Sequence, residues 1–426
     1  IMLNVKKIIN DSNIAFGTSG ARGLVIDFTH DVCAAFTHAF LSVIGDKYNF
    51  NKVALAIDNR PSSYEIAQAC AFAIKKHGFA VEYHGVIPTP ALAHYSMQKN
   101  IPCIMVTGSH IPFDRNGLKF YRPDGEITKE DELAIVNSEY AFSPVGVLPN
   151  LETSTQGADY YLERYVSLFN PDILKGKRIG VYEHSSAGRD LYAPLFNQLG
   201  AEVISLGRSD EFVPIDTEAV SDEDRIIARE WSKKYNLDAI FSTDGDGDRP
   251  LVADENGEWL RGDILGLLTA IELNIKALAI PVSCNTAIEQ SHKFASIQRT
   301  KIGSPYVIAA FTDLAKQFDS VAGFEANGGF LLASDLQING KELKSLPTRD
   351  AVLPALMLLI ASRNSTISQL IKNLPQRFTW SDRVKNFPSE SSQQIIKNAI
   401  SSPNNFFDSL GYESLSCSAI DETDGA

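Results

Sequence analysis

The stretch IPCIMVTGSHIPFDRNGLKFY (101–121) decides how the rest of the chain is interpreted. It opens with an apolar run at 101–106 that has the length of a buried strand. A strand that ends in Gly-Ser-His places Ser109 at the carboxyl edge of a sheet, which is where open α/β sheets bind their ligands. Because a serine alone is a poor nucleophile, it needs a base, a cation or a metal ion beside it. His110 and Lys119 follow closely and are candidates for the first two.

Short apolar strands alternate with helices in a pattern that occurs three times along the chain. The predicted strands lie at 53–57, 80–84 and before Thr107, then at 177–182, 202–206 and 237–242, then at 277–283, 296–302 and 321–324. The predicted helices follow Pro61 and Pro90, end at Leu199, and span 222–235, 286–294 and 305–318. This alternation predicts βαβ units with parallel strands, so the fold class is α/β with three similar domains.

The loop after the last strand of each copy contains the chemically unusual residues. Ser109 lies in the first loop, STDGDGDRP (242–250) forms the second, and FEANGG (324–329) forms the third. Ligands of open α/β sheets bind beyond the carboxyl ends of the strands. We therefore expect these three equivalent loops to converge on one cleft between the domains.

Domain boundaries are expected in three segments, at 143–157, near 256–262 and around 373–380. The predicted domains are a serine-loop domain at 1–150, an aspartate-loop domain at 151–258, a third α/β domain at 259–372 and a smaller piece at 373–426. The ending NNFFDSLGYESLSCSAIDETDGA (404–426) has a strand-rich composition, which makes the last piece α+β.

Charge and composition exclude several classes of function. A net charge of −13 disfavours nonspecific nucleic-acid binding, so an anionic substrate needs a local basic pocket. The best apolar run, 351–361, contains Pro354 and is shorter than the roughly 18 residues of a membrane helix, so it predicts a buried helix. Five scattered cysteines without CxxC spacing indicate a reducing compartment. We expect a cytoplasmic monomer or weak dimer with no nucleic-acid or membrane partner.

Asp244, Asp246 and Asp248 alternate with glycines, so their carboxylates can fold around a hard cation. Mg²⁺ is the expected ion. An EF-hand loop is one alternative, because Glu255 stands at its twelfth position. Arg249 occupies the sixth position, however, where that loop needs glycine. A solvated acidic turn is the other alternative.

The residues around the serine also have structural interpretations. Ser109 could cap the next element, although the neighbouring cations and the aspartate loop favour phosphoryl chemistry. Lys119 is a candidate general acid/base, or else a surface lysine on a strand. His110 could orient the serine or a phosphate, or it could hydrogen-bond its own loop.

Two glycine-containing turns offer ligands for a sugar phosphate. FGTSGARG (16–23) holds Arg22, whose guanidinium can grip a phosphate while the glycines let backbone amides approach it. Glu325 and Asn327 could hydrogen-bond two sugar hydroxyls, and a plain turn is the alternative.

These four motifs occur in the order seen in the α-D-phosphohexomutases, the family of phosphomannomutases, phosphoglucomutases and phosphoglucosamine mutases. FGTSGARG resembles its N-terminal signature, TGSHIPFDRNGLK its phosphoserine loop, DGDGDR its metal loop and FEANGG its sugar-binding loop. DNRPSS (58–63) and GVIPTP (85–90) are also similar to family segments, and the likeness covers essentially the whole chain.

The resemblance implies four domains around a central cleft and assigns a role to each candidate residue. Ser109 would be the phosphoserine, and Asp244, Asp246 and Asp248 would hold Mg²⁺ together with an oxygen on Ser109. The residues around the transferring phosphoryl group would be Arg22, Arg249, His110 and Lys119, and the sugar hydroxyls would bind Glu325 and Asn327. The family's last domain carries an arginine/serine/threonine phosphate clamp that is not found before Ala426, so we expect this domain to be incomplete.

The implied reaction interconverts hexose 1-phosphate and hexose 6-phosphate. Phospho-Ser109 would give its phosphoryl group to the substrate, and the resulting hexose 1,6-bisphosphate would reorient and return the other one. Such transfer depends on positioning and charge neutralisation. Many members carry a histidine in the loop at 301–306, where this chain has KIGSPY. Lys301 and Ser304 are therefore the substrate-binding candidates on that side.

Several activities remain as alternatives. The resemblance favours a phosphomannomutase, with a phosphoglucomutase second. A phosphoglucosamine mutase is less expected, because that branch usually has aspartate where this chain has Ser19. A noncatalytic sugar-phosphate binding protein is possible from another class, although the intact serine and aspartates argue against it. A metal-dependent phosphatase would release free phosphate instead of exchanging isomers.

Overall fold

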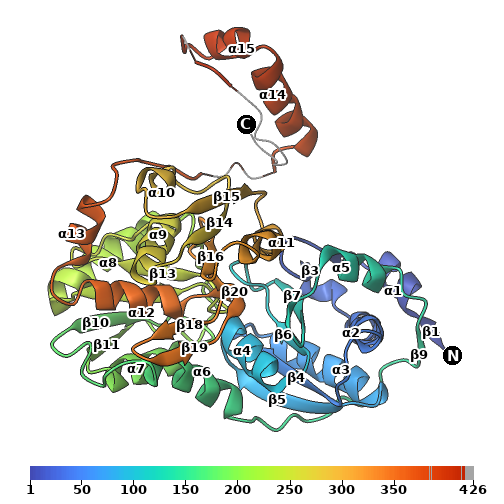
Figure 1. The fold of residues 1–426 in the computed structure, drawn as a ribbon. Helices are drawn as coiled ribbons and strands as arrows, with labels where there is room; N and C mark the ends of the chain where they lie inside the picture. Colours follow the sequence, from blue (N-terminus) through green and yellow to red (C-terminus); the bar gives the residue numbers. More distant parts are fainter. Residues whose placement is uncertain (383, 385, 414, 418–426) are drawn as a thin grey trace.

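A computed structural model describes residues 1–382, 384, 386–413 and 415–417 (Figure 1). Within these residues the chain forms three mixed sheets that repeat one topology. In each sheet a central strand runs parallel to the next two strands of the chain, and the following strand returns antiparallel to the last of them. The α/β prediction with three similar mixed-sheet copies is therefore confirmed.

The first sheet has the strand order β2-β3-β7-β6-β4-β5, with β8 paired to β7. Its strands are β2 (Ala15–Phe16), β3 (Ala21–Leu24), β4 (Lys52–Ile57), β5 (Ala80–Val86), β6 (Cys103–Val106), β7 (Arg115–Arg122) and β8 (Gly125–Glu126). Its helices are α1 (Val5–Asp11), α2 (His30–Gly45), α3 (Ser63–Lys76), α4 (Thr89–Lys99) and α5 (Lys129–Val136), with a 3₁₀ turn at Val25–Asp27. The short strands β1 (Leu3–Asn4) and β9 (Ala141–Phe142) pair with each other.

The second sheet has the order β11-β10-β12-β13. Its strands are β10 (Arg178–Tyr182), β11 (Glu202–Leu206), β12 (Ala239–Thr243) and β13 (Pro250–Ala253), and its helices are α6 (Gln156–Val166), α7 (Arg189–Gln198) and α8 (Asp222–Tyr235). Helix α8 has the bounds that its sequence predicts. Ser221 caps its first turn, acidic residues follow, and Asn236 ends it in the left-handed conformation.

The third sheet has the order β15-β14-β16-β17-β20. Its strands are β14 (Ala277–Pro281), β15 (Ser296–Thr300), β16 (Val321–Phe324), β17 (Phe330–Leu332) and β20 (Leu346–Asp350), and a hairpin is formed by β18 (Leu336–Ile338) and β19 (Lys341–Leu343). Its helices are α9 (Gly262–Glu272), α10 (Ala287–Gln290), α11 (Ser304–Ala315), α12 (Val352–Ala361) and α13 (Ile367–Lys372). Helix α12 is buried with Pro354 inside it, as predicted.

One face of the first sheet shares a continuous hydrophobic core with the second and third sheets, through residues such as Met105 on β6. One continuous cluster of buried side chains includes Tyr161 on α6, Phe241 on β12, Phe324 on β16 and Leu356 on α12. The outer face of the first sheet has a separate cluster against α2 and α3, which includes Phe36. This packing brings the carboxyl ends of β6, β12 and β16 into one region.

Two predicted elements differ from the structure. The third-copy helix expected at 286–294 ends early, because the backbone of His292 turns left-handed at φ 52° after α10. The strand-rich ending is wrong where it is described, since α14 (Ser389–Ser401) is followed by a second helix, α15 (Pro403–Ser409). Pro403 suits the first turn of a helix. The remainder at 418–426 lies outside the described residues.

Helices α14 and α15 stand apart from the three sheets in Figure 1. They pack on each other, and large apolar side chains such as Leu410 and Tyr412 are exposed. Among the described residues, no helix is long and apolar enough to cross a membrane.

Candidate active site

Ser109 lies in the loop between β6 and β7, fully buried, with a left-handed backbone at φ 56°. This conformation is unfavourable for a residue other than glycine, so the surrounding contacts must hold it. The backbone N–H of Ser109 donates to the Thr107 hydroxyl at 2.8 Å. Its own hydroxyl donates to Oδ2 of Asp244 at 3.0 Å. The serine loop and the aspartate loop are thus in direct contact.

The buried ion pair between Arg60 and Asp58 holds the serine loop in place. Arg60 donates to Asp58 at 3.0 Å, to the Ser109 carbonyl at 2.9 Å and to the Pro112 carbonyl at 2.7 Å. Asp58 also accepts a hydrogen bond from Thr107 at 2.7 Å. Burial raises the pKa of Asp58 and lowers that of Arg60. Both shifts disfavour the charged forms, and the ion pair with its several hydrogen bonds offsets this cost and fixes the loop.

The aspartate triplet fits a divalent cation. Ligand oxygens of Asp244, Asp246 and Asp248 lie within 4.8 Å of one another, and all three residues are buried. In the part of the chain that the structure describes, Oδ1 of Asp246 and of Asp248 is buried without a hydrogen-bond partner. Burial and the two neighbouring carboxylates raise the pKa of Asp244. Hard oxygen ligands with unpaired lone pairs are what Mg²⁺ or Ca²⁺ requires.

The EF-hand alternative is excluded by the flanking elements. The triplet lies between strands β12 and β13, not between helices. Glu255, at the position of the last EF-hand ligand, accepts hydrogen bonds from the backbone and hydroxyl of Ser368.

Basic side chains surround the triplet. The Lys119 ammonium group on β7 lies 2.6 Å from Asp246 and 3.1 Å from Asp248. The guanidinium of Arg249 lies 2.9 Å from Nδ1 of His110 and 4.0 Å from Asp244. These contacts bring the expected acid/base, the histidine and one arginine to the buried carboxylates.

Arg22 belongs to the same group of cations. Its Nε donates to the Ser19 carbonyl at 3.1 Å, and Nη2 is buried without a partner among the described residues. Burial, together with repulsion from Arg249 and Arg349, lowers the pKa of Arg22 to about 10. A buried cation with an unused donor is suited to an anionic ligand.

Arg349 connects the FEANGG loop to the aspartate loop. Glu325 accepts a hydrogen bond from Arg349 on β20 at 3.1 Å, and Arg349 also donates to Asp248 at 3.1 Å. The side-chain oxygen of Asn327 accepts a bond from the backbone of Gly329 at 2.9 Å. Asn327 therefore shapes its own turn, and Glu325 is the group of this loop that is joined to the other site residues.

The candidates in the KIGSPY segment lie at the start of α11. Lys301 lies over the ring of Tyr306, with Nζ 5.8 Å from its centre. Ser304 is buried and donates to Glu126 on β8 at 3.1 Å. Burial raises the pKa of Glu126 to about 7. Ser304 is therefore tied to the first sheet.

Several residues joined to the site carry no role in the sequence interpretation: Asp58, Arg60, Thr89, Glu126 and Arg349. Asp58 and Arg60 lie in DNRPSS and Thr89 lies in GVIPTP, so the likeness of these two segments to the family could have identified the three residues. Thr89 donates to Asp246 at 2.6 Å. No local pattern marks Arg349, whose partners lie far away in the sequence.

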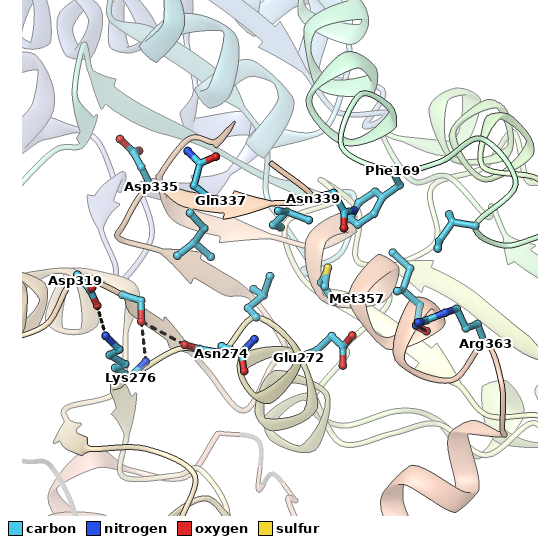
Figure 2. Close-up of a pocket in the computed structure, with 16 residues that line it drawn as sticks. Phe169, Glu272, Asn274, Lys276, Asp319, Asp335, Gln337, Asn339, Met357 and Arg363 are labelled. Atoms are coloured by element: carbon cyan, nitrogen blue, oxygen red, sulfur yellow. Dashed lines mark hydrogen bonds and ion pairs between the residues drawn. The ribbon is translucent and has the colours of Figure 1, made fainter. Parts of the chain in front are cut away.

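A separate hollow of about 630 Å³ lies away from these loops, between α9, α12 and the β18–β19 hairpin (Figure 2). Three of its lining residues, Lys276, Asp319 and Ser320, interact with one another. Lys276 lies 2.9 Å from Asp319, and the Ser320 hydroxyl accepts from the Lys276 backbone at 2.9 Å. These satisfied contacts contrast with the unpaired oxygens of the aspartate loop.

Comparison with known proteins agrees with this arrangement. Residues 13–141 match the family model for phosphoglucomutase/phosphomannomutase, alpha/beta/alpha domain I, and residues 261–378 match the model for domain III. The chain is 59% identical over 422 residues to a phosphomannomutase of Salmonella muenchen, covering 99% of this chain and 88% of the relative. It is 40% identical over 393 residues to a phosphomannomutase of Sinorhizobium fredii, covering 89% of this chain and 83% of the relative.

The fold is similar to that of a solved phosphoglucomutase/phosphomannomutase family protein from Burkholderia thailandensis. The TM-score is 0.68 at 21% identity, over 84% of this chain and 79% of the other. The chain belongs to the phosphoglucomutase/phosphomannomutase family. It is a phosphohexomutase, an enzyme of the phosphotransferase type that isomerises sugar phosphates.

Proposed function

We propose that this enzyme interconverts mannose 1-phosphate and mannose 6-phosphate through a phosphoserine at Ser109 and a hexose 1,6-bisphosphate intermediate. The contact between the Ser109 hydroxyl and Asp244 at 3.0 Å is the observation that carries the proposal. It supports a serine that works beside three buried carboxylates and several cations. The relatives that are named phosphomannomutase support mannose phosphate as the preferred substrate, with glucose phosphate second.

The reaction consists of two phosphoryl transfers. In the first, the bond between phosphorus and Oγ of Ser109 breaks, and a bond forms to the free hydroxyl of the hexose monophosphate. The proton of that hydroxyl must leave, and the serine oxygen must receive one in return. After the bisphosphate reorients, the opposite exchange restores the phosphoserine and releases the isomer. Atoms and charge are therefore balanced over one cycle.

The chain's own groups supply positioning and charge for these steps. Lys119 is the proposed acid/base, since its ammonium group reaches the aspartate loop beside the serine. Arg22, Arg249 and His110 would bind the anionic phosphoryl oxygens. Glu325 would accept hydrogen bonds from sugar hydroxyls, and Asn327 would maintain the turn. Lys301 is proposed to bind substrate at the start of α11, with Ser304 holding that segment in place.

Mg²⁺ is the proposed metal ion. Asp244, Asp246 and Asp248 would hold it, with an oxygen on Ser109 completing the set. When bound, it would neutralise phosphoryl charge as a Lewis acid. A cytoplasmic location is also part of the proposal, and the five scattered cysteines support it.

A ³¹P NMR assay separates this function from its alternatives. The purified chain is incubated with mannose 1-phosphate, Mg²⁺ and a trace of mannose 1,6-bisphosphate. We expect the 6-phosphate signal to appear without inorganic phosphate, and to be absent with Ser109→Ala. Accumulation of inorganic phosphate would indicate a phosphatase. Binding without any conversion would indicate a sugar-phosphate binding protein. Faster conversion of glucose 1-phosphate would change the assigned substrate.

A further inference from the structure

Arg349 joins three segments of the site that are far apart in the sequence. Its Nη1 donates to Glu325 at 3.1 Å, its Nε donates to Asp248 at 3.1 Å, and its Nη2 donates to the Ser19 hydroxyl at 2.7 Å. The side chain is almost fully buried. One guanidinium thus contacts the sugar-binding loop, the aspartate loop and the N-terminal turn.

The charge of Arg349 is maintained by its partners. Burial opposes the ionised form, but Asp248, Glu325 and Glu126 outweigh it, so the pKa of Arg349 is raised. Losing one member of such a buried pair leaves an uncompensated charge on the other. The positive charge of Arg349 is therefore required to compensate the buried carboxylates of Asp248 and Glu325.

The backbone around Arg349 is built to hold it in one place. A Cβ added to Gly329 would lie 2.5 Å from the Arg349 side chain, so only glycine at this position leaves room for the aliphatic part of Arg349. On one side of it, Thr348 and Tyr121 on β7 are hydrogen-bonded at 3.1 Å. On the other side, Asp350 accepts hydrogen bonds from Tyr161 and Tyr165 on α6. Strand β20 is thus anchored to two other parts of the molecule.

We propose that Arg349 is a positioning residue that sets the Glu325 carboxylate relative to the aspartate loop. This inference rests on the proposed function, in which Glu325 binds the sugar and the aspartate loop serves the phosphoryl group. A planar guanidinium can bond two carboxylates in fixed directions, whereas an ammonium group cannot hold both in the same geometry. The distance between sugar and phosphoserine would therefore depend on this one side chain.

The test is a double-mutant cycle between Arg349 and Glu325. Arg349→Gln should lower kcat/KM for the hexose phosphate roughly 10- to 100-fold, as removal of a residue that orients a ligand-binding group commonly does. Most of the loss should appear in KM. In the Glu325→Gln background the same change should cost clearly less than in the parent, because only the contacts to Asp248 and Ser19 are then lost. Arg349→Lys should give an intermediate loss.

Arg164→Gln is the matched control. Arg164 is also buried, and it bonds the Lys344 carbonyl at 2.8 Å and, at 3.1 Å, Tyr165, which is a partner of the β20 anchor Asp350. Among the described residues none of its hydrogen bonds goes to Arg349, Glu325, Asp248 or Ser19, so its variant disturbs the surroundings of β20 without removing the contacts under test. Its variant should keep kcat and KM within about threefold of the parent even if its midpoint of thermal unfolding falls. If Arg349→Gln does not fold, the cycle is made with Arg349→Lys.

Two results would overturn the inference. One is a loss in kcat/KM that is equal in the parent and in the Glu325→Gln background, and the other is a KM for Arg349→Gln no different from that of Arg164→Gln. Failure of the proposed function is seen separately, since the parent enzyme would then convert no hexose phosphate at all.

Discussion

Arg60 shows how a single buried side chain can control a reactive serine. It bonds two carbonyls of the serine loop, and its guanidinium lies 4.1 Å from the centre of the Phe212 ring. Arg60→Lys keeps the charge but cannot donate to both carbonyls at once, so Ser109 should relax from its left-handed backbone conformation. We expect kcat to fall roughly 10- to 100-fold. Steady-state kinetics, with circular dichroism as the folding control, checks this, and an unchanged kcat would show that the loop holds its own shape.

Glu126 predicts a pH dependence of stability. Its pKa of about 7 lies above the ordinary 4.5, so the folded protein holds more protons than the unfolded chain between these values. Its contribution to stability is therefore full below pH 4.5 and is lost as the pH rises through 7. Glu126→Gln should remove this loss, which amounts to about 3 kcal/mol at most.

Urea unfolding of the parent and Glu126→Gln at about pH 5 and about pH 8 makes the comparison. The difference in unfolding free energy between the two pH values should be smaller in the variant. Glu130→Gln, at an exposed position of α5, serves as the control and should behave like the parent. Equal pH dependence of Glu126→Gln and the parent would contradict the assignment.

At the scale of elements, the loops after β6 and β12 pack so closely that one position admits only glycine. A Cβ on Gly245 would lie 2.7 Å from the Ser109 carbonyl and 3.0 Å from Phe212. Gly245→Ala should push the serine loop away from Asp244 and lower kcat by at least about tenfold. Gly45→Ala, where a Cβ meets nothing within 4 Å, should leave kcat unchanged. A fully active Gly245→Ala would mean that the two loops can separate without consequence.

Helix α12 contributes to the stability of the fold because its side chains are buried in the core. Leu356 is fully buried in the cluster that joins the second and third sheets. Leu356→Ala should lower the free energy of unfolding by about 2–5 kcal/mol through lost burial and a residual cavity. Denaturant unfolding measures this directly. A loss below about 1 kcal/mol would show that the core closes around the gap.

At the scale of the whole molecule, the aspartate triplet predicts that a divalent ion stabilises the fold. Three buried carboxylates that lie within 4.8 Å of one another repel when ionised. Mg²⁺ at a hundred times its dissociation constant should add about 2.7 kcal/mol to the free energy of unfolding, and EDTA should remove the gain. Asp244→Asn should abolish the response to Mg²⁺. A melting temperature that is insensitive to Mg²⁺ in the parent would contradict the metal assignment.

The repeated topology could be predicted because each strand and helix carries its own local signal. Strand β16 has the predicted bounds, and α8 carries its cap and charged ends within its own sequence. The loops after β6, β12 and β16 could be located for the same reason. The C-terminal piece was predicted wrongly where it is described, because its paired phenylalanines are typical of strands, whereas Pro403 begins helix α15.

The loops that form the candidate site could be predicted from the sequence, but the hydrogen bonds that connect them could not. Ser109 and the aspartates follow strands in recognisable motifs, so their meeting follows from sheet topology. The bonds of Arg349 to Ser19, Asp248 and Glu325 join positions that only the folded chain brings together. Burial decides such contacts, and a single charged residue in SLPTRD does not reveal its burial.

The phosphoserine mechanism is tested most simply by the intact mass of the purified chain, with peptide mapping, before and after incubation with Mg²⁺ and mannose 1,6-bisphosphate. We predict one added phosphoryl group in the peptide that contains Ser109, and none in Ser109→Ala. Addition of mannose 6-phosphate should then discharge it. Conversion of mannose phosphates by a parent enzyme whose Ser109 is never phosphorylated would rule out the phosphoserine mechanism.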